Sequence, residues 1–265
     1  MYTQLAYIAG FVDGDGCIHV SKKRHVSRLD VTVTDFEPIQ FIAKHFNKNI
    51  YTKYEKNSPF NAKPRYCTKC SGFDLLPHLK SLLPFLVEKR NNAFSILKQY
   101  NAYEDFPYLQ HTREEFFAWL AGFSEAEGHF GVRKRKVSQP KRTTISGERI
   151  YDYTETFYQL VNTNESLMNY VLQKLRDYGI TKKMKYNTIK GYKRMCQITK
   201  RMITRKPLHR IILSGGDALF LYKEIYPFMK IKRKKDKITE SIMLSKKRRY
   251  KHKRLKEALK HYEAE

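Results

Sequence analysis

The sequence has few residues of several kinds, and each shortage excludes a class of protein. Four cysteines in 265 residues are too few for a disulfide-rich secreted scaffold and are typical of a reduced, intracellular protein. No apolar run reaches the length of about 18 residues that a membrane-spanning helix needs. The first residues, Met-Tyr-Thr-Gln-Leu-Ala-Tyr, lack the basic start of a secretory signal peptide. We therefore expect neither membrane insertion nor export.

Acidic residues are also scarce relative to basic ones. The chain has 26 Asp and Glu against 52 Lys and Arg, for a net charge of +26. Such an excess predicts a polyanionic partner, and the phosphate backbone of a nucleic acid is the expected one. A generally basic protein, such as a ribosomal protein, would share the charge but not the repeat described next.

One of the few acidic patterns occurs twice. Residues 5–16 read Leu-Ala-Tyr-Ile-Ala-Gly-Phe-Val-Asp-Gly-Asp-Gly, and residues 117–128 read Phe-Ala-Trp-Leu-Ala-Gly-Phe-Ser-Glu-Ala-Glu-Gly. The second acid is Asp15 in one copy and Glu127 in the other. A period of about 110 residues, the size of a small domain, predicts two similar halves, 1–107 and 108–265.

Each copy is predicted to be a helix that ends at its acids. Thr112 and Glu115 form a capping-box pattern before the second copy, Thr3 is a weaker N-cap for the first, and Gly16 and Gly128 are natural stops. Carboxylates at a helix C-terminus face the negative end of its dipole, which costs about 0.3–1 kcal/mol each. Either the acids simply end two surface helices, or a divalent cation offsets the cost. The repetition favours the cation.

Small residues in mid-helix support the same interpretation. Gly10 and Gly122 each cost about 1 kcal/mol relative to Ala inside a helix, which a close approach of two helix backbones would explain. If the two helices pack together, Asp15 and Glu127 meet at the end of the seam. Opposed carboxylates that share divalent metal ions are suited to phosphodiester hydrolysis.

These two motifs resemble those of the single-chain LAGLIDADG homing endonucleases. The resemblance implies an α+β fold of two pseudo-symmetric halves, each with a curved antiparallel sheet backed by helices, with the motif helices at the interface and the sheets forming a saddle over DNA. It implies that magnesium (Mg²⁺) is bound by Asp15 and Glu127 and by the carbonyls of Gly14 and Ala126. Mn²⁺ or Ca²⁺ would substitute in binding.

A second repeat follows each motif. Pro-Phe-Leu-x-x-Lys ends at Lys89, and Pro-Phe-Met-x-x-Lys ends at Lys232. The resemblance implies that these lysines lie by the cleavage centre and are catalytic, whereas ordinary phosphate-binding lysines are the alternative. Family members often carry a polar residue after the second strand to hold a water. Asp35 takes this place in the first half, with Asn162 or Asn164 in the second.

Alternating patterns after the motifs predict antiparallel strands with one polar face. In so basic a protein we expect this face to read base edges in the major groove, although a solvated sheet face is the plainer interpretation. The predicted DNA-binding residues are His19, Ser21, Lys23, Asp30, Thr32, Thr34, Lys53, His129, Arg133 and Arg135.

The sequence thus predicts a monomeric, site-specific, metal-dependent endonuclease of the intron type, cutting both strands of a long asymmetric site in double-stranded DNA. The alternative is a maturase that binds intron RNA, with or without nuclease activity. The expected location is an organelle (chloroplast or mitochondrion) or the cytoplasm of a bacterial or phage host. Cys67 and Cys70, with His78 nearby, supply at most part of a zinc site, so two strand cysteines are the simpler interpretation.

Overall fold

The computed structural model describes residues 2–21, 26–54, 63–102, 111–140, 148–180, 185–191, 193–195, 202–204 and 206–246. The fold is α+β, as expected, with two four-stranded antiparallel sheets backed by helices in two pseudo-symmetric halves. The chain forms two compact units: residues 1–128 with 225–235, and residues 129–224 with 236–265. The second motif helix thus belongs to the first unit. The division into halves at residue 107 describes the sequence repeat and stays a prediction.

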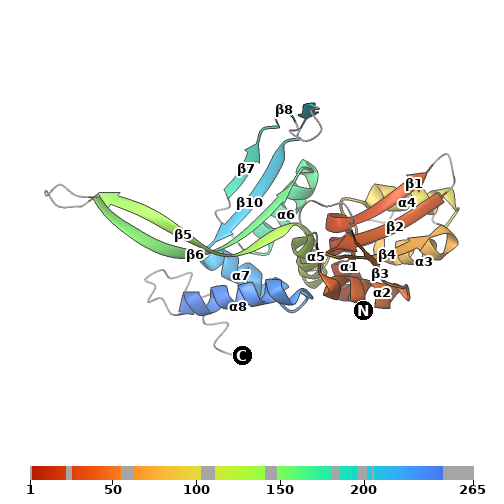
Figure 1. The fold of residues 1–265 in the computed structure, drawn as a ribbon, viewed down its shortest axis with the longest axis horizontal. Coiled ribbons are helices and arrows are strands. Elements are labelled where there is room, and N and C mark those ends of the chain that lie inside the picture. The colour runs from red at the N-terminus through yellow and green to blue at the C-terminus, as the bar shows by residue number, and fades with distance from the viewer. Residues whose placement is uncertain are drawn as a thin grey trace. The chain divides into compact units, whose positions relative to one another are not determined.

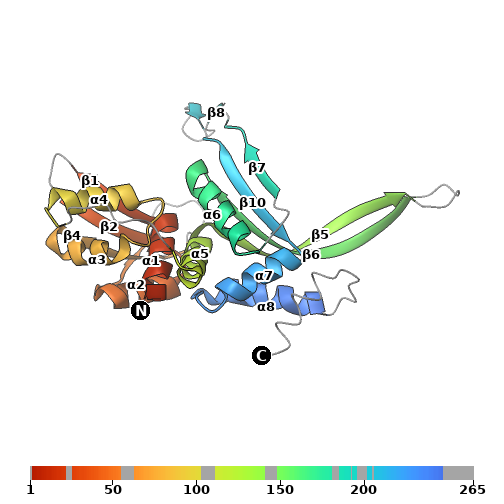
Figure 2. The same ribbon diagram turned by 180° about the vertical axis from the view of Figure 1, so that it is seen from behind.

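The first unit contains one four-stranded sheet and the helices α1 to α5 (Figure 1). Its sheet has the strand order β1-β2-β4-β3, and Figure 2 shows α3 and α4 in front of it. The elements are α1 (Tyr2–Asp15), β1 (Gly16–Ser21), β2 (Val26–Val33), α2 (Phe36–Phe46), β3 (Tyr51–Lys53), β4 (Arg65–Ser71), the 3₁₀ turn η1 (Gly72–Leu75), α3 (Leu76–Leu82), α4 (Arg90–Gln99) and α5 (Arg113–Glu127).

The predicted alternation along the first two strands is confirmed. Ile18, Leu29 and Val31 are buried, whereas His19 in β1 and Thr34, directly after β2, are exposed. Ile18 lies opposite Leu29 in the antiparallel pair of β1 and β2, so the apolar side chains share one face. The opposite face is left for polar side chains.

The predicted helix boundaries around the motifs are confirmed with one exception. Thr112 accepts the Glu115 amide at 3.3 Å and donates its own amide to the Glu115 carboxylate at 2.9 Å, which completes the capping box of α5. Gly16 and Gly128 directly follow α1 and α5. Thr3 is not an N-cap, because α1 already begins at Tyr2.

The sequence of residues 84–97 predicts one continuous helix, but residues 84–89 are not helical. The helix α4 begins only at Arg90. The amides of Val87 and Lys89 donate to the Asp13 carboxylate at 2.8 and 2.9 Å. Hydrogen bonds to Asp13 on α1 therefore take the place of helical hydrogen bonds in this segment. The apolar pattern of the sequence does not indicate this contact.

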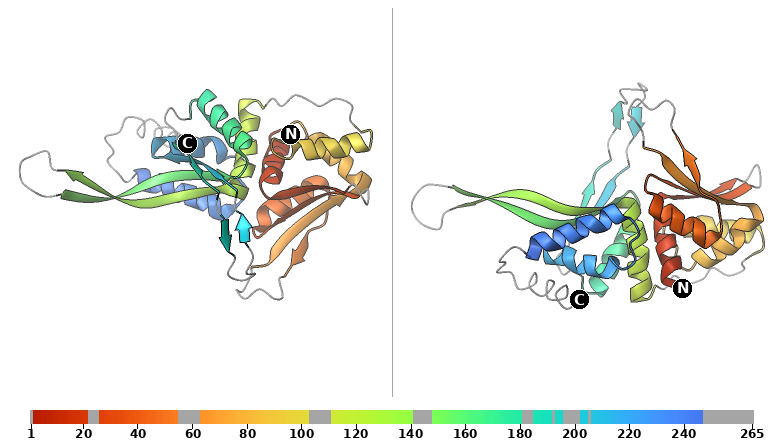
Figure 3. Two further views of the ribbon diagram at one scale, coloured as in Figure 1. Left: turned by 90° about the horizontal axis from the view of Figure 1, so that it is seen from above. Right: turned by 60° about the horizontal axis from the view of Figure 1, so that its bottom comes forward.

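The second unit holds the other large sheet, with the order β5-β6-β10-β7, and a separate β8-β9 pair (Figure 3). The sequence Asn-Glu-Ser-Leu predicts a helix capped by Asn164, and Asn164 does cap α6 by accepting the Leu167 amide at 3.1 Å. Tyr222 donates a 2.5 Å bond to the carbonyl of Phe157, which holds α7 on β6. The elements are β5 (Gly128–Pro140), β6 (Glu148–Asn162), α6 (Glu165–Asp177), β7 (Lys185–Ile189), β8 (Lys193–Met195), β9 (Met202–Thr204), β10 (Leu208–Ser214), α7 (Gly216–Ile225) and α8 (Lys232–Lys246).

In the described part of the chain, none of the helices combines the length and apolar character needed to span a bilayer.

Candidate active site

The two motif helices, α1 and α5, lie against each other with their backbones in contact (Figure 3). A Cβ atom on Gly10 would lie 2.7 Å from the carbonyl carbon of Trp119 and closer still to its oxygen. A Cβ atom on Gly122 would lie 2.8 Å from the amide nitrogen of Phe11. The prediction that these two glycines allow a close helix approach is therefore confirmed.

This packing brings the C-terminal ends of α1 and α5 together. A Cβ atom on Gly14 would overlap the Cβ atom of Ala126, so the last turns of the two helices touch. The final acids, Asp15 and Glu127, are exposed beyond this contact. The first acid of each motif is instead buried, with Asp13 at 1% and Glu125 at 3% exposure. The two acids of each motif therefore have different surroundings and different tasks.

Asp13 serves as an anchor. Its carboxylate accepts the amides of Val87 and Lys89 and, at 2.9 Å, the indole N–H of Trp119. Burial raises its pKa to about 6, although these hydrogen bonds and the charge of Lys89 lower it. Because Trp119 belongs to α5, Asp13 joins three segments: α1, α5 and the turn before α4.

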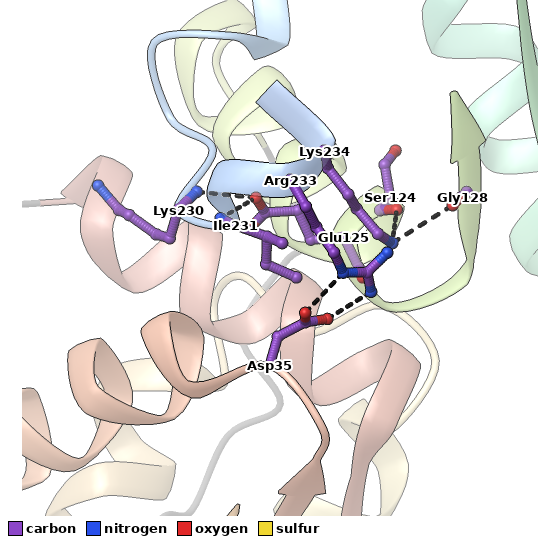
Figure 4. A network of polar contacts seen from close by, with 8 residues as sticks. All are labelled: Asp35, Ser124, Glu125, Gly128, Lys230, Ile231, Arg233 and Lys234. Atoms are coloured by element: carbon purple, nitrogen blue, oxygen red, sulfur yellow. Dashed lines mark hydrogen bonds and ion pairs between the residues drawn. The ribbon is translucent and has the colours of Figure 1, made fainter. Parts of the chain in front are cut away.

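Glu125 repeats this arrangement in the second motif. It accepts the amides of Lys230 and Ile231 at 2.8 and 2.6 Å (Figure 4), and the hydroxyl of Tyr7 at 2.5 Å. Burial raises its pKa, and the Tyr7 hydrogen bond and the two amides lower it. Each buried acid thus takes an aromatic donor from the opposite motif helix and two amides from a following turn.

These anchored turns deliver one lysine to each helix end. The Lys89 ammonium donates to the carbonyls of Val12 at 2.8 Å, Gly14 at 3.3 Å and Asp13. A cation at the C-terminal carbonyls offsets the negative end of the helix dipole, which the motif acids otherwise worsen.

At the end of α5 the lysine is Lys234, not the predicted Lys232. The Lys234 ammonium donates to the carbonyls of Glu125 at 2.5 Å and of Ser124 and Gly128 at 3.4 Å (Figure 4). Lys234 is 8% exposed, whereas Lys232 is an exposed residue at the start of α8. Lys89 directly precedes α4, whereas Lys232 is already the first residue of α8. The lysine that contacts the end of α5 therefore lies two positions after the repeat lysine.

The two exposed acids interact electrostatically with each other and with both lysines. Partial desolvation between the helix ends raises the pKa of Glu127, and the charge of Asp15 raises it further. Partial desolvation also raises the pKa of Asp15, while Lys234 lowers it more than Lys89 does. For Glu127 the order is reversed, with Lys89 the stronger lysine. Asp15 and Lys234 also line the same cavity, so we call these two residues the Asp15–Lys234 pair and the other two the Glu127–Lys89 pair.

No family model matches the sequence, and no curated protein matches it. Solved structures do match. The I-LtrWI LAGLIDADG homing endonuclease bound to target DNA has a TM-score of 0.54 and 13% identity, over 97% of this chain and 96% of that one. The LAGLIDADG meganuclease I-AabMI bound to uncleaved DNA has a TM-score of 0.52 and 17% identity, over 92% of both chains. Meganuclease I-SmaMI bound to uncleavable DNA has a TM-score of 0.50 and 13% identity, over 98% and 96%. The chain has the LAGLIDADG fold.

The donors at the ends of the LAGLIDADG helices fit a divalent cation of the magnesium type. Two exposed carboxylates whose charges repel each other lie beside helix-terminal carbonyls, and all of these are hard oxygen ligands. No group of three or more His, Cys, Asp or Glu residues suited to a metal occurs among the described residues. Magnesium commonly binds through one or two carboxylates, with waters and substrate phosphates completing its shell. Gly14 offers a carbonyl that already accepts from Lys89, and Ala126 lines the cavity beside Asp15.

The predicted DNA-reading residues differ in exposure and in the contacts that their side chains make. His19, Thr34, Lys53 and His129 are exposed, and Thr32 is half-buried. Asp30 is paired with Arg28 at 2.8 Å, and Arg133 is paired with Glu155 at 3.0 Å. The side chains of Ser21, Lys23 and Arg135 lie outside the described residues. The role of this set in DNA binding stays a prediction.

The two cysteines of β4 do not share one face of the sheet. Cys67 lies opposite Thr32 in the sheet and Cys70 lies opposite the core residue Leu29, so the two side chains point to opposite faces. Both are buried, free thiols. The simpler interpretation, two strand cysteines, fits this geometry.

A pH dependence of stability should reveal the burial of the Asp13 carboxyl group. Its folded-state pKa of about 6 lies above the ordinary value of 3.8, so the folded protein holds this proton more tightly than the unfolded chain. The resulting stabilisation is complete below about pH 4 and is lost as the pH rises through about 6; the shift corresponds to roughly 3 kcal/mol.

The measurement is chemical unfolding of wild type and Asp13→Asn between pH 4 and pH 7. Since the variant lacks the titrating group, the stability of wild type relative to Asp13→Asn should grow as the pH is lowered. A difference that stays constant across this range would contradict a raised pKa for Asp13.

Proposed function

We propose that this protein is a site-specific endonuclease that hydrolyses both strands of a double-stranded DNA target with the help of a divalent cation. One observation carries the proposal. The ends of α1 and α5 touch, and each presents one exposed acid, Asp15 or Glu127, and one lysine. A buried, anchored acid in each motif fixes the helix end that carries the exposed one. This arrangement supplies two reaction centres from a single chain, and one for each strand is what double-strand cleavage requires. The LAGLIDADG fold and the net charge of +26 support a DNA substrate.

Asp15 and Glu127 would hold the cation, with carbonyls of the last helical turns completing its protein ligands. The cation, when bound, supplies Lewis acidity for the phosphodiester and its attacking water. The lysines have a separate task that needs no metal. Each is fixed by backbone carbonyls, so its ammonium is preorganised to stabilise negative charge that develops on the phosphate.

The proposal is tested by incubating the protein with a library of randomised DNA duplexes and magnesium, and sequencing the cut ends. Double-strand breaks at one preferred sequence would support it, and that sequence becomes the substrate for every later assay. Tight binding of DNA without cutting, under magnesium and manganese alike, would reject the nuclease. Tight binding of the protein's own intron RNA without DNA cutting would favour the maturase instead.

We expect each of the two lysines, Lys89 and Lys234, to assist cleavage of a different DNA strand, and we expect Lys232 to assist neither. We expect Lys234→Met to slow the cut beside Asp15, and Lys89→Met to slow the cut beside Glu127, each by about 100-fold. Lys232→Met removes the same charge from an exposed neighbour and serves as the matched control. The measurement is single-turnover cleavage of a duplex labelled differently on each strand.

A Lys232→Met variant that loses as much activity as Lys234→Met would overturn this assignment. It would mean that α8 is placed differently when DNA is bound.

A further inference from the structure

A bidentate ion pair links the end of β2 to the start of α8. The guanidinium of Arg233 donates to the Asp35 carboxylate through Nε at 2.6 Å and Nη2 at 2.5 Å (Figure 4). Asp35 directly precedes α2, yet its side chain makes no cap hydrogen bond to that helix. The carboxylate is therefore committed to Arg233, whose hydrogen bond holds the pKa of Asp35 below its ordinary value.

This pair lies beside the motif acid of the first half. Asp35 and Arg233 line a cavity of about 280 Å³ together with Asp15, Lys234 and Arg65. The cavity thus presents three basic side chains next to the exposed acid of the Asp15–Lys234 pair. Asp15, Asp35 and Glu125 also line the cavity, but Asp35 is paired with Arg233, and Glu125 accepts Tyr7 and two backbone amides. The basic side chains can therefore receive a phosphate group, with Asp15 beside them.

Arg233 retains donors for such a phosphate. A guanidinium has five N–H groups in a rigid planar fork, and the contacts to Asp35 engage one edge of it. The side chain of Arg233 remains 55% exposed, while that of Asp35 is 18% exposed. The half-buried Asp35 therefore fixes the orientation of a guanidinium whose remaining edge is accessible.

The Glu127–Lys89 pair lacks an arginine at the position equivalent to Arg233, directly before the lysine. Arg233 directly precedes Lys234, whereas the residue directly before Lys89 is Glu88. The negative charge of Glu88 helps to raise the pKa of Glu127. One pair is thus flanked by a cation and the other by an anion, although the two lysines make equivalent contacts with their helix ends.

We propose that Asp35 orients Arg233 as a phosphate-positioning residue for the cut beside Asp15, so that the two DNA strands are cut at unequal rates. The inference rests on the proposed nuclease function and assigns a specific device to one of its two centres. It predicts that loss of Arg233 converts double-strand cleavage into accumulation of a nicked duplex.

The experiment measures single-turnover cleavage of each strand of the selected target by wild type, Arg233→Ala, Arg233→Lys, Asp35→Asn and the double variant Asp35→Asn/Arg233→Ala. We expect Arg233→Ala to slow the strand that Lys234→Met affects by about 10- to 100-fold, with the other strand changed less than about threefold. Arg233→Lys should recover part of the loss, because it restores the charge without the fork. Asp35→Asn should slow the same strand less, since Arg233 remains but is held by fewer hydrogen bonds.

The double variant distinguishes phosphate positioning from simple neutralisation of Asp35. If Arg233 serves only to cancel the Asp35 charge, removing both should restore cleavage of the affected strand to near the wild-type rate, and the proposal is wrong. If Arg233 contacts the phosphate, the double variant stays as slow as Arg233→Ala. Lys237→Ala, which removes an exposed charge further along α8, should leave the ratio of the two strand rates unchanged.

Failure of this inference differs from failure of the proposed function. If wild type cuts neither strand, the nuclease itself is rejected. If wild type cuts both strands and Arg233→Ala slows them equally while keeping the wild-type melting temperature, the nuclease stands and the strand-specific role of Arg233 is rejected.

Discussion

Replacing both motif acids, Asp15→Asn together with Glu127→Gln, should reduce DNA cleavage by at least about 10³-fold on both strands, because the cation that the two acids would hold lowers the barrier by several kcal/mol. The substitutions are nearly isosteric, and both side chains are exposed, so folding should be retained. DNA binding should be kept or strengthened, since two negative charges leave a surface that faces phosphate. The measurements are single-turnover cleavage and DNA affinity at one fixed salt concentration.

The matched control is Glu240→Gln, an exposed acid on α8 outside the site. It should cut at the wild-type rate. A double variant that still cuts within about tenfold of wild type would mean that the motif acids are not the metal ligands. Loss of DNA binding together with cleavage would point instead to a structural role for these acids.

The second large effect concerns the helix seam. Gly10→Ala and Gly122→Ala should each destabilise the protein by about 3 kcal/mol or more, because the added methyl meets the backbone of the opposite helix rather than a side chain that can rotate away. This cost exceeds the gain of about 1 kcal/mol that Ala brings inside a helix. The measurement is the free energy of unfolding by chemical denaturation.

Ser95→Ala, at an exposed position of α4, is the control and should change stability by less than about 0.5 kcal/mol. If either glycine variant were as stable as wild type, the two motif helices could not be in backbone contact. Cleavage by the glycine variants should fall as well, since the same contact sets the separation of Asp15 and Glu127.

The sequence determined the features that depend on local pattern and repetition. Two copies of one motif, each with a mid-helix glycine and acids at its end, were sufficient to predict packed helices and paired carboxylates. Thr112 and Glu115 specified the start of α5, because a capping box acts within one helical turn. Alternation of apolar residues such as Ile18 and Val31 specified the buried face of the first sheet.

Only the tertiary structure decided which polar groups meet across long separations in sequence. The anchoring of residues 87 and 89 by Asp13 ended a predicted helix, and no local pattern announces a carboxylate supplied by a distant segment. The lysine that contacts the end of α5 is Lys234 rather than Lys232. This depends on where α8 begins relative to the Pro-Phe-Met-x-x-Lys repeat, and the sequence pattern does not specify that point.

Asp35 shows the same limit most clearly. It lies directly before α2, where an Asp commonly caps the helix, but its carboxylate pairs with Arg233, 198 residues away. A side-chain oxygen forms whichever strong hydrogen bonds the folded chain offers, and a bidentate guanidinium is a better partner than a single amide. Propensity and periodicity fix the helices and strands, whereas the choice of partner for each buried or half-buried charge follows from the packing that brings distant segments together.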